Sequence, residues 1–164
     1  MKYTRFEDLP VWKASIQLGV QTYSMTAKRA FTGRRSLRDQ IERAAVSVSN
    51  NIAEGFERGT TQELLTFLYI ARGSAGEVRS MLCLVERLPG FDDLKYLKSE
   101  ISNLKSMAES ISRQLRGWAD SLQNSGIKGQ RYLTDKTRRA TQSAREREEF
   151  MEQLRRIREG EEES

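Results

Sequence analysis

The sequence contains no histidine and a single cysteine, Cys83. Histidine is the commonest general base and a common metal ligand, so its absence excludes helical nucleases that use an Arg–His pair and di-iron bundles that use Glu-x-x-His. Zinc would need an all-carboxylate shell, which it rarely adopts. We therefore expect a non-enzymatic protein with no catalytic residues, no metal and no cofactor. One cysteine cannot form an internal disulfide, which favours a reducing compartment.

Long apolar runs are also missing from the chain. The opening MKYTRFEDLP has no apolar core of a signal peptide, and no stretch approaches the roughly 18 to 20 apolar residues that a membrane span needs. We therefore expect a cytoplasmic protein that makes no membrane contact. A net charge of +5 favours acidic partners such as nucleic acid, but only clustered charge indicates one.

Apolar residues recur at spacings of three and four in four segments. This pattern predicts helices over residues 8–27, 36–57, 61–88 and 92–122. Two prolines and 31% charged residues fit a helical protein. Together these features predict an all-α fold, an antiparallel up-down four-helix bundle, for residues 1–122.

Local signals mark where the first two helices begin. Asp8 is a candidate cap for the first helix, and Pro10 falls in its first turn, where the missing N–H costs nothing. Ser36 is the candidate cap for the second helix, which Gly59 ends. The stripe expected to face the core from the first helix consists of Trp12, Ile16, Val20, Tyr23 and Ala27.

The third helix opens with Thr60 and Glu63, which form a capping-box pattern. Its apolar residues cover more than one face, whereas a single bundle buries only one side of each helix, so we expect a second buried surface against another subunit. Gly73 and Gly76 lie either on an exposed turn of the helix, where glycine is tolerated, or at a position where glycine lets a neighbouring helix approach closely. We favour close approach because the flanking residues are apolar. The expected subunit interface consists of Phe67, Tyr69, Ile70, Gly73, Gly76, Met81 and Leu84.

The fourth helix follows a turn at Pro89 and carries an unbroken heptad seam from Leu94 to Leu122. Beyond it, residues 123–164 form a charged tail with ten basic and nine acidic side chains. We expect this tail to be flexible, or conditionally helical where it docks on a partner, because its apolar stripe is too thin to be stable alone. The stripe consists of Phe150, Met151, Leu154 and Ile157.

The densest cluster of positive charge spans the end of the first helix and the start of the second. Residues 28–38 hold five positive and no negative side chains. Positive charge suits the C-terminus of the first helix, but it gains nothing at the N-terminus of the second, which favours phosphate binding there. The alternative is a solvated surface without a ligand. The candidate nucleic-acid-binding residues are Lys28, Arg29, Arg34, Arg35, Arg38 and Arg43.

Three segments follow one another in an order that is typical of one bacterial family. FEDLPVWKASIQL (residues 6–18) and RAAVSVSNNIAEGF (residues 43–56) are followed by a pattern E-x-x-x-F-L-x-I-A-x-G-S over residues 63–74. They resemble the 23S ribosomal RNA intervening-sequence proteins, which carry a similar opening, an RAAVSI…NIAEGF signature and the same third pattern. The resemblance covers residues 6–118, with Ser49 where the family usually has proline.

The resemblance implies a four-helix bundle that assembles as a ring, typically a homopentamer. Similar bundles serve as accessory proteins of the reverse transcriptases of diversity-generating retroelements, where the basic surface of the ring meets nucleic acid. Two hypotheses follow. In the first, the ring binds nucleic acid, RNA before DNA, through its basic surface. In the second, the protein is an interaction scaffold or accessory subunit, for example of a reverse transcriptase, that docks through its C-terminal tail.

Overall fold

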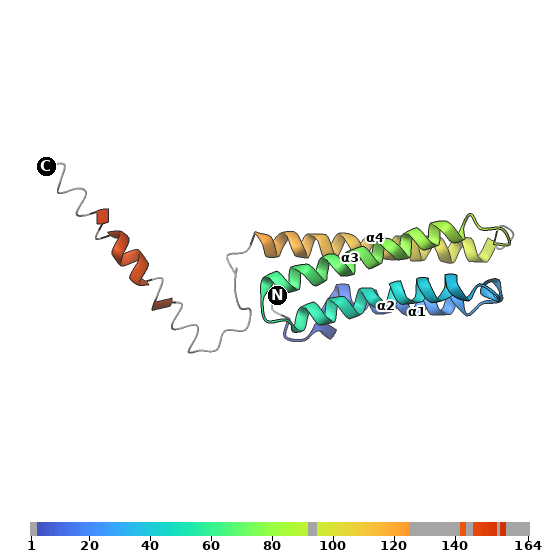
Figure 1. The fold of residues 1–164 in the computed structure, drawn as a ribbon, viewed down its shortest axis with the longest axis horizontal. Coiled ribbons are helices and arrows are strands. Elements are labelled where there is room, and N and C mark those ends of the chain that lie inside the picture. The colour runs from blue at the N-terminus through green and yellow to red at the C-terminus, as the bar shows by residue number, and fades with distance from the viewer. Residues whose placement is uncertain (1–2, 92–94, 125–141, 144–145, 154, 157–164) are drawn as a thin grey trace. The chain divides into compact units, whose positions relative to one another are not determined.

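The computed structural model describes residues 3–91, 95–124, 142–143, 146–153 and 155–156. Its elements in these residues are helices, which confirms the all-α prediction for this part of the chain (Figure 1). In chain order they are η1 (Phe6–Asp8), α1 (Pro10–Thr26), η2 (Arg29–Phe31), α2 (Arg35–Glu57), α3 (Thr61–Val85) and α4 (Lys95–Gln123). Residues 92–94 of the expected fourth helix, and Leu154 and Ile157 of the expected tail stripe, lie outside the described residues.

The chain divides into two compact units, Met1–Gly129 and Gln130–Ser164. The first unit contains the four long helices. In the second unit, residues 146–153 are helical. Phe150 and Met151 of the expected tail stripe are each 58% exposed on this short helix. The second unit therefore presents apolar side chains that it does not bury itself.

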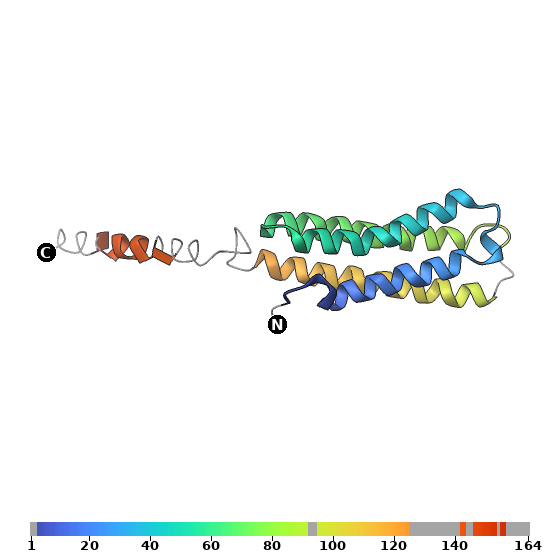
Figure 2. The same cartoon turned by 90° about the horizontal axis from the view of Figure 1, so that it is seen from below.

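The four long helices lie side by side (Figures 1 and 2). α1 and α3 each pack against both α2 and α4, so α2 and α4 separate α1 from α3. None of the described helices is long and apolar enough to cross a membrane. Every long helix contributes to one apolar core, whose largest fully buried side chains are Leu18, Met25, Ile41, Ile52, Leu64, Leu68, Leu82, Leu97, Ile101, Leu104, Ile111 and Leu115.

α1 buries a different face from the predicted one. Val20 and Tyr23, which we expected in the core, are 54% and 48% exposed. The buried face consists of Val11, Ser15, Leu18, Thr22 and Met25. Its polar members are satisfied within the helix, because Ser15 donates to the Val11 carbonyl at 2.7 Å and Thr22 donates to the Leu18 carbonyl at 2.8 Å. These hydroxyl residues interrupt the apolar pattern and so concealed the inward face.

The cap of α1 is Leu9, one residue after the predicted cap Asp8. Pro10 fills the first helical position, as predicted. Asp8 does not cap α1, because Asp8 belongs to η1 and Leu9 takes the cap position. The ring of Phe6 in η1 packs edge-to-face against Trp12, with ring centroids 5.2 Å apart. Trp12 is partly buried against the core, so η1 folds over the beginning of α1.

The sequence predicted the cap of α3 correctly but not the cap of α2. Thr60 caps α3, as predicted: its hydroxyl accepts a hydrogen bond from the backbone N–H of Glu63 at 3.2 Å and donates to the Glu63 carboxylate at 2.7 Å. Ser36 does not cap α2. The helix begins at Arg35, with Arg34 in the cap position and no side-chain cap. The N–H groups at the start of α2 therefore lack a side-chain acceptor at the cap.

α2 and α3 approach closely where small side chains meet. A Cβ added at Gly55 would lie 2.6 Å from the Cβ of Phe67, so glycine is required for this approach. Further along, the hydroxyls of Ser47 and Ser74 lie 2.9 Å apart. The side-chain amide of Asn51 donates to the Ser47 carbonyl at 2.7 Å and to its hydroxyl at 2.9 Å. This network gives polar groups on a packed surface their partners, so it is structural.

Candidate nucleic-acid and subunit surfaces

The six predicted nucleic-acid-binding residues all lie at the end of the helices where α1 passes through η2 into α2. Two of them precede or begin η2, two form the start of α2, and two lie in its following turns. In chain order they are Lys28, Arg29, Arg34, Arg35, Arg38 and Arg43. Arg43 lies eight residues along α2 from Arg35, and the structure gives the six residues different surroundings.

Arg34 is held against the turn between α3 and α4. Its guanidinium lies 4.4 Å from the centroid of the Phe91 ring and donates a hydrogen bond to the Pro89 carbonyl. Gly90 has a φ of 86°, and a Cβ there would come within 2.9 Å of the Arg34 guanidinium. Phe91 packs edge-to-face on the buried ring of Phe31, with centroids 5.1 Å apart. Arg34 therefore joins two turns of the fold.

Three other cations of the set have acidic neighbours. Lys28 forms an ion pair with Glu100 of α4. Arg35 and Arg38 lie on either side of Asp39, at 3.5 and 3.6 Å. The Arg35 side chain is nonetheless 87% exposed, so this pair is held loosely and screened by water. The run of positive charge seen in the sequence is thus partly balanced by carboxylates that follow it or come from α4.

Arg29 and Arg43 are exposed and form no ion pair with another described residue. Together with Arg35 they present guanidinium groups, whose planar fork of donors matches the geometry of phosphate. A depression of about 210 Å³ lies at this turn. Its polar lining supplies hydroxyl, ammonium and guanidinium donors. The residues that line it are Thr26, Ala27, Lys28, Phe31, Thr32, Gly33, Arg35 and Arg38.

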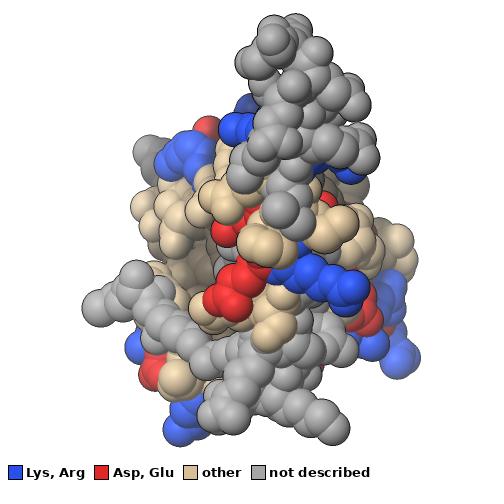
Figure 3. All heavy atoms as spheres, turned by 90° about the vertical axis from the view of Figure 1, so that its left-hand side faces the viewer, with Lys and Arg blue, Asp and Glu red and all other residues tan. Residues whose placement is uncertain are grey.

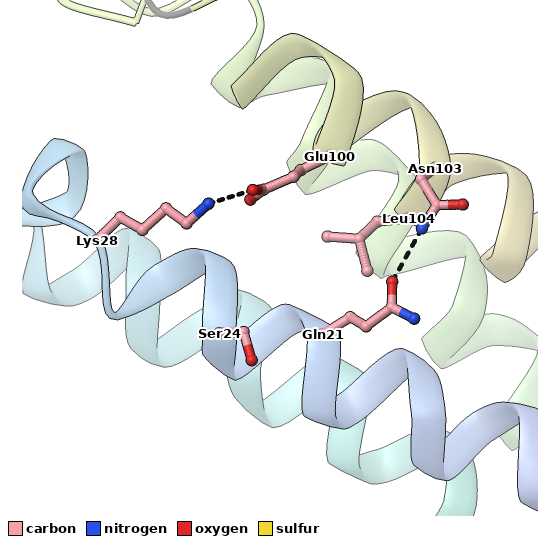
Figure 4. A pocket seen from close by; sticks show the side chains of 6 residues that line it. All are labelled: Gln21, Ser24, Lys28, Glu100, Asn103 and Leu104. Carbon is pink, nitrogen blue, oxygen red and sulfur yellow. Dashed lines mark hydrogen bonds and ion pairs between the residues drawn. The ribbon is translucent and has the colours of Figure 1, made fainter. Parts of the chain in front are cut away.

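A second depression, of about 220 Å³, opens between α1 and α4 (Figure 4). Lys28 reaches across to Glu100 on one side, and the Asn103 amide donates to Gln21 at 2.9 Å on the other. Buried Leu104 lies between these two bridges (Figure 4). Because its polar lining is already engaged in bridges from α1 to α4, this depression is better explained as part of the helix packing than as a ligand site.

The opposite end of the helices, where α2 turns into α3, faces the viewer in Figure 3. Lys, Arg, Asp and Glu are coloured by sign in this view. The pairs in this part of the chain include Arg58 with Glu54, and Arg5 with Glu7 at 2.8 Å. The side-chain hydrogen bond from Arg5 holds the pKa of Glu7 below its ordinary value. This end therefore carries both signs in paired side chains, whereas Arg29 and Arg43 near the turn between α1 and α2 have no ion pair with another described residue.

The predicted interface residues lie on α3, where they differ in exposure. Three of them are 43%, 45% and 45% exposed: Tyr69, Ile70 and Leu84. Phe67 and Met81 are partly buried within the chain. Gly73 and Gly76 are exposed, and a Cβ at either position would meet nothing within 4 Å. Packing within the protomer therefore does not require glycine at these two positions.

The sequence prediction missed a second exposed apolar face, on α1. Val20 and Tyr23 form it together with the partly buried Ile16. Gly19 lies within the same helix turn and also has open space around its missing Cβ. The sequence did contain a signal for this face: Lys13 is the single charged residue in Pro10–Thr26, whereas the solvent-facing side of a helix normally carries several.

The family described as 23S rRNA-intervening sequence protein matches this sequence over residues 7–117. The chain belongs to that family. The match runs from η1 through most of α4, and it confirms the resemblance that the sequence motifs indicated. The second unit lies outside the matched region of this intervening-sequence family protein. No curated protein matches the sequence.

Solved structures are also similar to this chain, and one of them is described by its family. It is a protein with unknown function from the S23 ribosomal protein family of Bacteroides thetaiotaomicron VPI-5482. The similarity has a TM-score of 0.56 at 18% sequence identity, and it covers 66% of this chain and 97% of that chain. At this identity the similarity concerns the fold alone.

Proposed function

We propose that this intervening-sequence family protein is a non-enzymatic RNA-binding protein that assembles as a ring, a homopentamer of antiparallel up-down four-helix bundles. Its RNA surface is the basic turn between α1 and α2, defined as Lys28, Arg29, Arg35, Arg38 and Arg43. The observation that carries the proposal is the exposure of three guanidinium groups: those of Arg29 and Arg43, which have no carboxylate partner among the described residues, and that of Arg35, whose side chain is 87% exposed. The family description, which names 23S rRNA, favours RNA over DNA.

The chemistry that this surface offers is phosphate binding. Guanidinium groups donate in pairs to phosphate oxygens, and each phosphate contact releases bound counterions, so binding should weaken as salt rises. In a ring the basic turn recurs in every subunit, and weak contacts add by avidity. Arg34 is left out of the contact set because its guanidinium already stacks on Phe91. We assign Arg34 a positioning role, since it holds the turn from which Arg35 projects.

Charge reversal on two different surfaces distinguishes a localised RNA-binding site from a general effect of net charge. The test variant is Arg29→Glu/Arg35→Glu/Arg43→Glu, and the matched control is Arg79→Glu/Arg113→Glu/Arg116→Glu on α3 and α4. All six side chains are exposed, so both variants should fold, and both change the net charge equally. Binding is measured by fluorescence anisotropy with a labelled mixed-sequence RNA between about 50 and 200 mM salt.

We expect the test variant to lose at least tenfold in affinity at low salt, whereas the control variant keeps most of its binding. The wild-type affinity should fall with salt at a logarithmic slope of about −0.7 for each single-strand phosphate contacted. Equal losses in both variants would assign binding to net charge alone. Wild-type binding by the test variant would remove the RNA function from this surface.

A second candidate function is favoured by the exposed apolar pair of the second unit. Phe150 and Met151, each 58% exposed, suit the apolar face of a helix that docks in a partner groove. In this alternative the protein is a scaffold or accessory subunit, for example of a reverse transcriptase. A pull-down with the full chain and with Phe150→Asp/Met151→Asp tests it: a partner lost from the variant supports docking, and the same proteins in both samples contradict it.

A further inference from the structure

Charge is distributed unequally among the four long helices. α1 has one charged residue in 17, and α3 has four in 25. α2 has seven in 23, and α4 has eight in 29. The two charge-poor helices are the pair that α2 and α4 separate. All four helices share one core, so the difference lies in what covers their outward sides. The charged residues of α1 and α3 are Lys13, Glu63, Arg72, Glu77 and Arg79.

The exposed apolar side chains follow the same division. In the described part of the first unit, every exposed large hydrophobic side chain lies on α1 or α3. The central parts of protein interfaces are depleted of charge and rich in such side chains, whereas surfaces in water are not. The side chains are Val20 and Tyr23 on α1, and Tyr69, Ile70 and Leu84 on α3.

The two faces also differ in shape, in a way that lets one fit the other. On α1, the ridge formed by Ile16, Val20 and Tyr23 repeats at spacings of four and three. On α3, the small residues Gly73, Gly76 and Ser80 recur at the same spacings in reverse order and are all exposed; we call this strip of small residues the groove. Glycine weakens a helix, and nothing in the protomer occupies the space of either missing Cβ. A helix from outside therefore has room to approach closely here, and ridges pack into grooves.

We infer that the ridge on α1 docks in the groove on α3 of a second copy of this chain. Within one chain the two faces cannot meet, because α2 and α4 lie between the helices that carry them. A contact between two α1 ridges, or between two α3 grooves, leaves the other apolar face of each copy in water. The head-to-tail contact covers both faces, and its repetition closes into a ring or extends as a filament.

This inference rests on the proposed ring and specifies which surfaces meet. Two variants each block one face. Val20→Glu/Tyr23→Glu adds charge to the ridge, and Gly73→Gln/Gly76→Gln fills the groove with good helix formers that have open space. Ser102→Glu/Ser106→Glu places two charges on the exposed side of α4 as a matched control. Circular dichroism checks that each variant keeps its helical content, and sedimentation velocity measures its mass.

We expect the wild type and the α4 control to have the same oligomeric mass, and each face variant alone to be a monomer. Mixed in equal amounts, the two face variants should form a heterodimer of twice the protomer mass and nothing larger, because one intact ridge meets one intact groove. The mixture is measured up to millimolar concentration, since a single contact lacks the avidity of a closed ring.

Two results overturn the inference in distinguishable ways. In the first, the wild type assembles, but either face variant still forms dimers alone or the mixture stays monomeric. The ridge–groove contact is then wrong, and other surfaces form the contacts of the oligomer. If the wild type is itself monomeric at all concentrations, then the proposed ring falls together with the contact.

Discussion

α1 and α3 share a core with α2 and α4, but their outward sides carry fewer charges and more exposed apolar side chains. On α4, exposed side chains pair along the helix, as Arg113 does with Glu109 at 3.1 Å and Arg116 with Asp120 at 3.7 Å. On α3, comparable exposed positions carry Tyr69 and Ile70. Pairs such as those on α4 contribute little stability but keep a helix soluble. The comparison teaches that the core fixes the fold, whereas the composition of the outward sides can differ from helix to helix, and this difference is the basis of the contact that we infer between copies.

Truncating two near neighbours on α3 should give the largest contrast. Leu68 is fully buried, and Ile70 is 45% exposed. In the monomeric Val20→Glu/Tyr23→Glu background, we expect Leu68→Ala to lower the free energy of unfolding by about 2–5 kcal/mol, because it leaves a cavity. Ile70→Ala should change it by less than about 0.5 kcal/mol. Urea denaturation measures both, and similar losses would show that Ile70 is needed inside the protomer.

The next contrast concerns glycines on an inward and an outward surface. Gly55→Ala should lower the free energy of unfolding by about 1–3 kcal/mol, because its Cβ would overlap that of Phe67. Gly76→Ala should raise it by up to about 1 kcal/mol in the same monomeric background, because alanine favours the helix and the space is open. Thermal denaturation checks the opposite signs. A destabilised Gly76→Ala monomer would contradict the claim that this glycine serves only a contact between copies.

The fold could be predicted largely from the inward pattern of each helix. α2 begins one residue before its predicted start, and α3 begins at the predicted Thr61, because apolar spacing and the Thr60 cap fix these positions. α3 ends at Val85, earlier than the apolar residues suggested. α1 itself was predicted, but its inward face was not, because Ser15 and Thr22 satisfy their hydroxyls on their own helix, so polar residues occupy that face.

The candidate site could be predicted less well, since charge counted along the chain takes no account of neighbours in space. Nothing near Lys28 in the sequence indicates that Glu100 of α4 will pair with it. Nor does the sequence show that the Arg34 guanidinium will stack on Phe91 and so be held against the turn between α3 and α4. Both partners are more than fifty residues away in the sequence. Phe91 lies at the end of the α3–α4 turn, and Glu100 lies beyond it in α4. Long-range packing thus decides which cations remain for a ligand.

The smallest expected effect concerns an ion pair between charge-rich α4 and the end of α3. Lys105 donates to both carboxylate oxygens of Glu86, at 3.1 and 2.9 Å. This hydrogen bond raises the pKa of Lys105. The folded state therefore holds the proton more tightly than the unfolded state. The stabilisation is fully present below the unfolded lysine pKa of about 10.4, and it is lost as pH rises through the raised value.

Lys105→Met should accordingly lower the free energy of unfolding by about 0.5–1 kcal/mol at neutral pH, since the pair is largely but not fully shielded from water. The loss should shrink above a pH of about 10.4, where the wild-type pair also weakens. Lys98→Met, an exposed lysine on the same helix, is the matched control and should show neither effect. Urea denaturation across this pH range measures both variants. A loss that stays constant with pH would assign the role of Lys105 to packing of its aliphatic stem rather than to its charge.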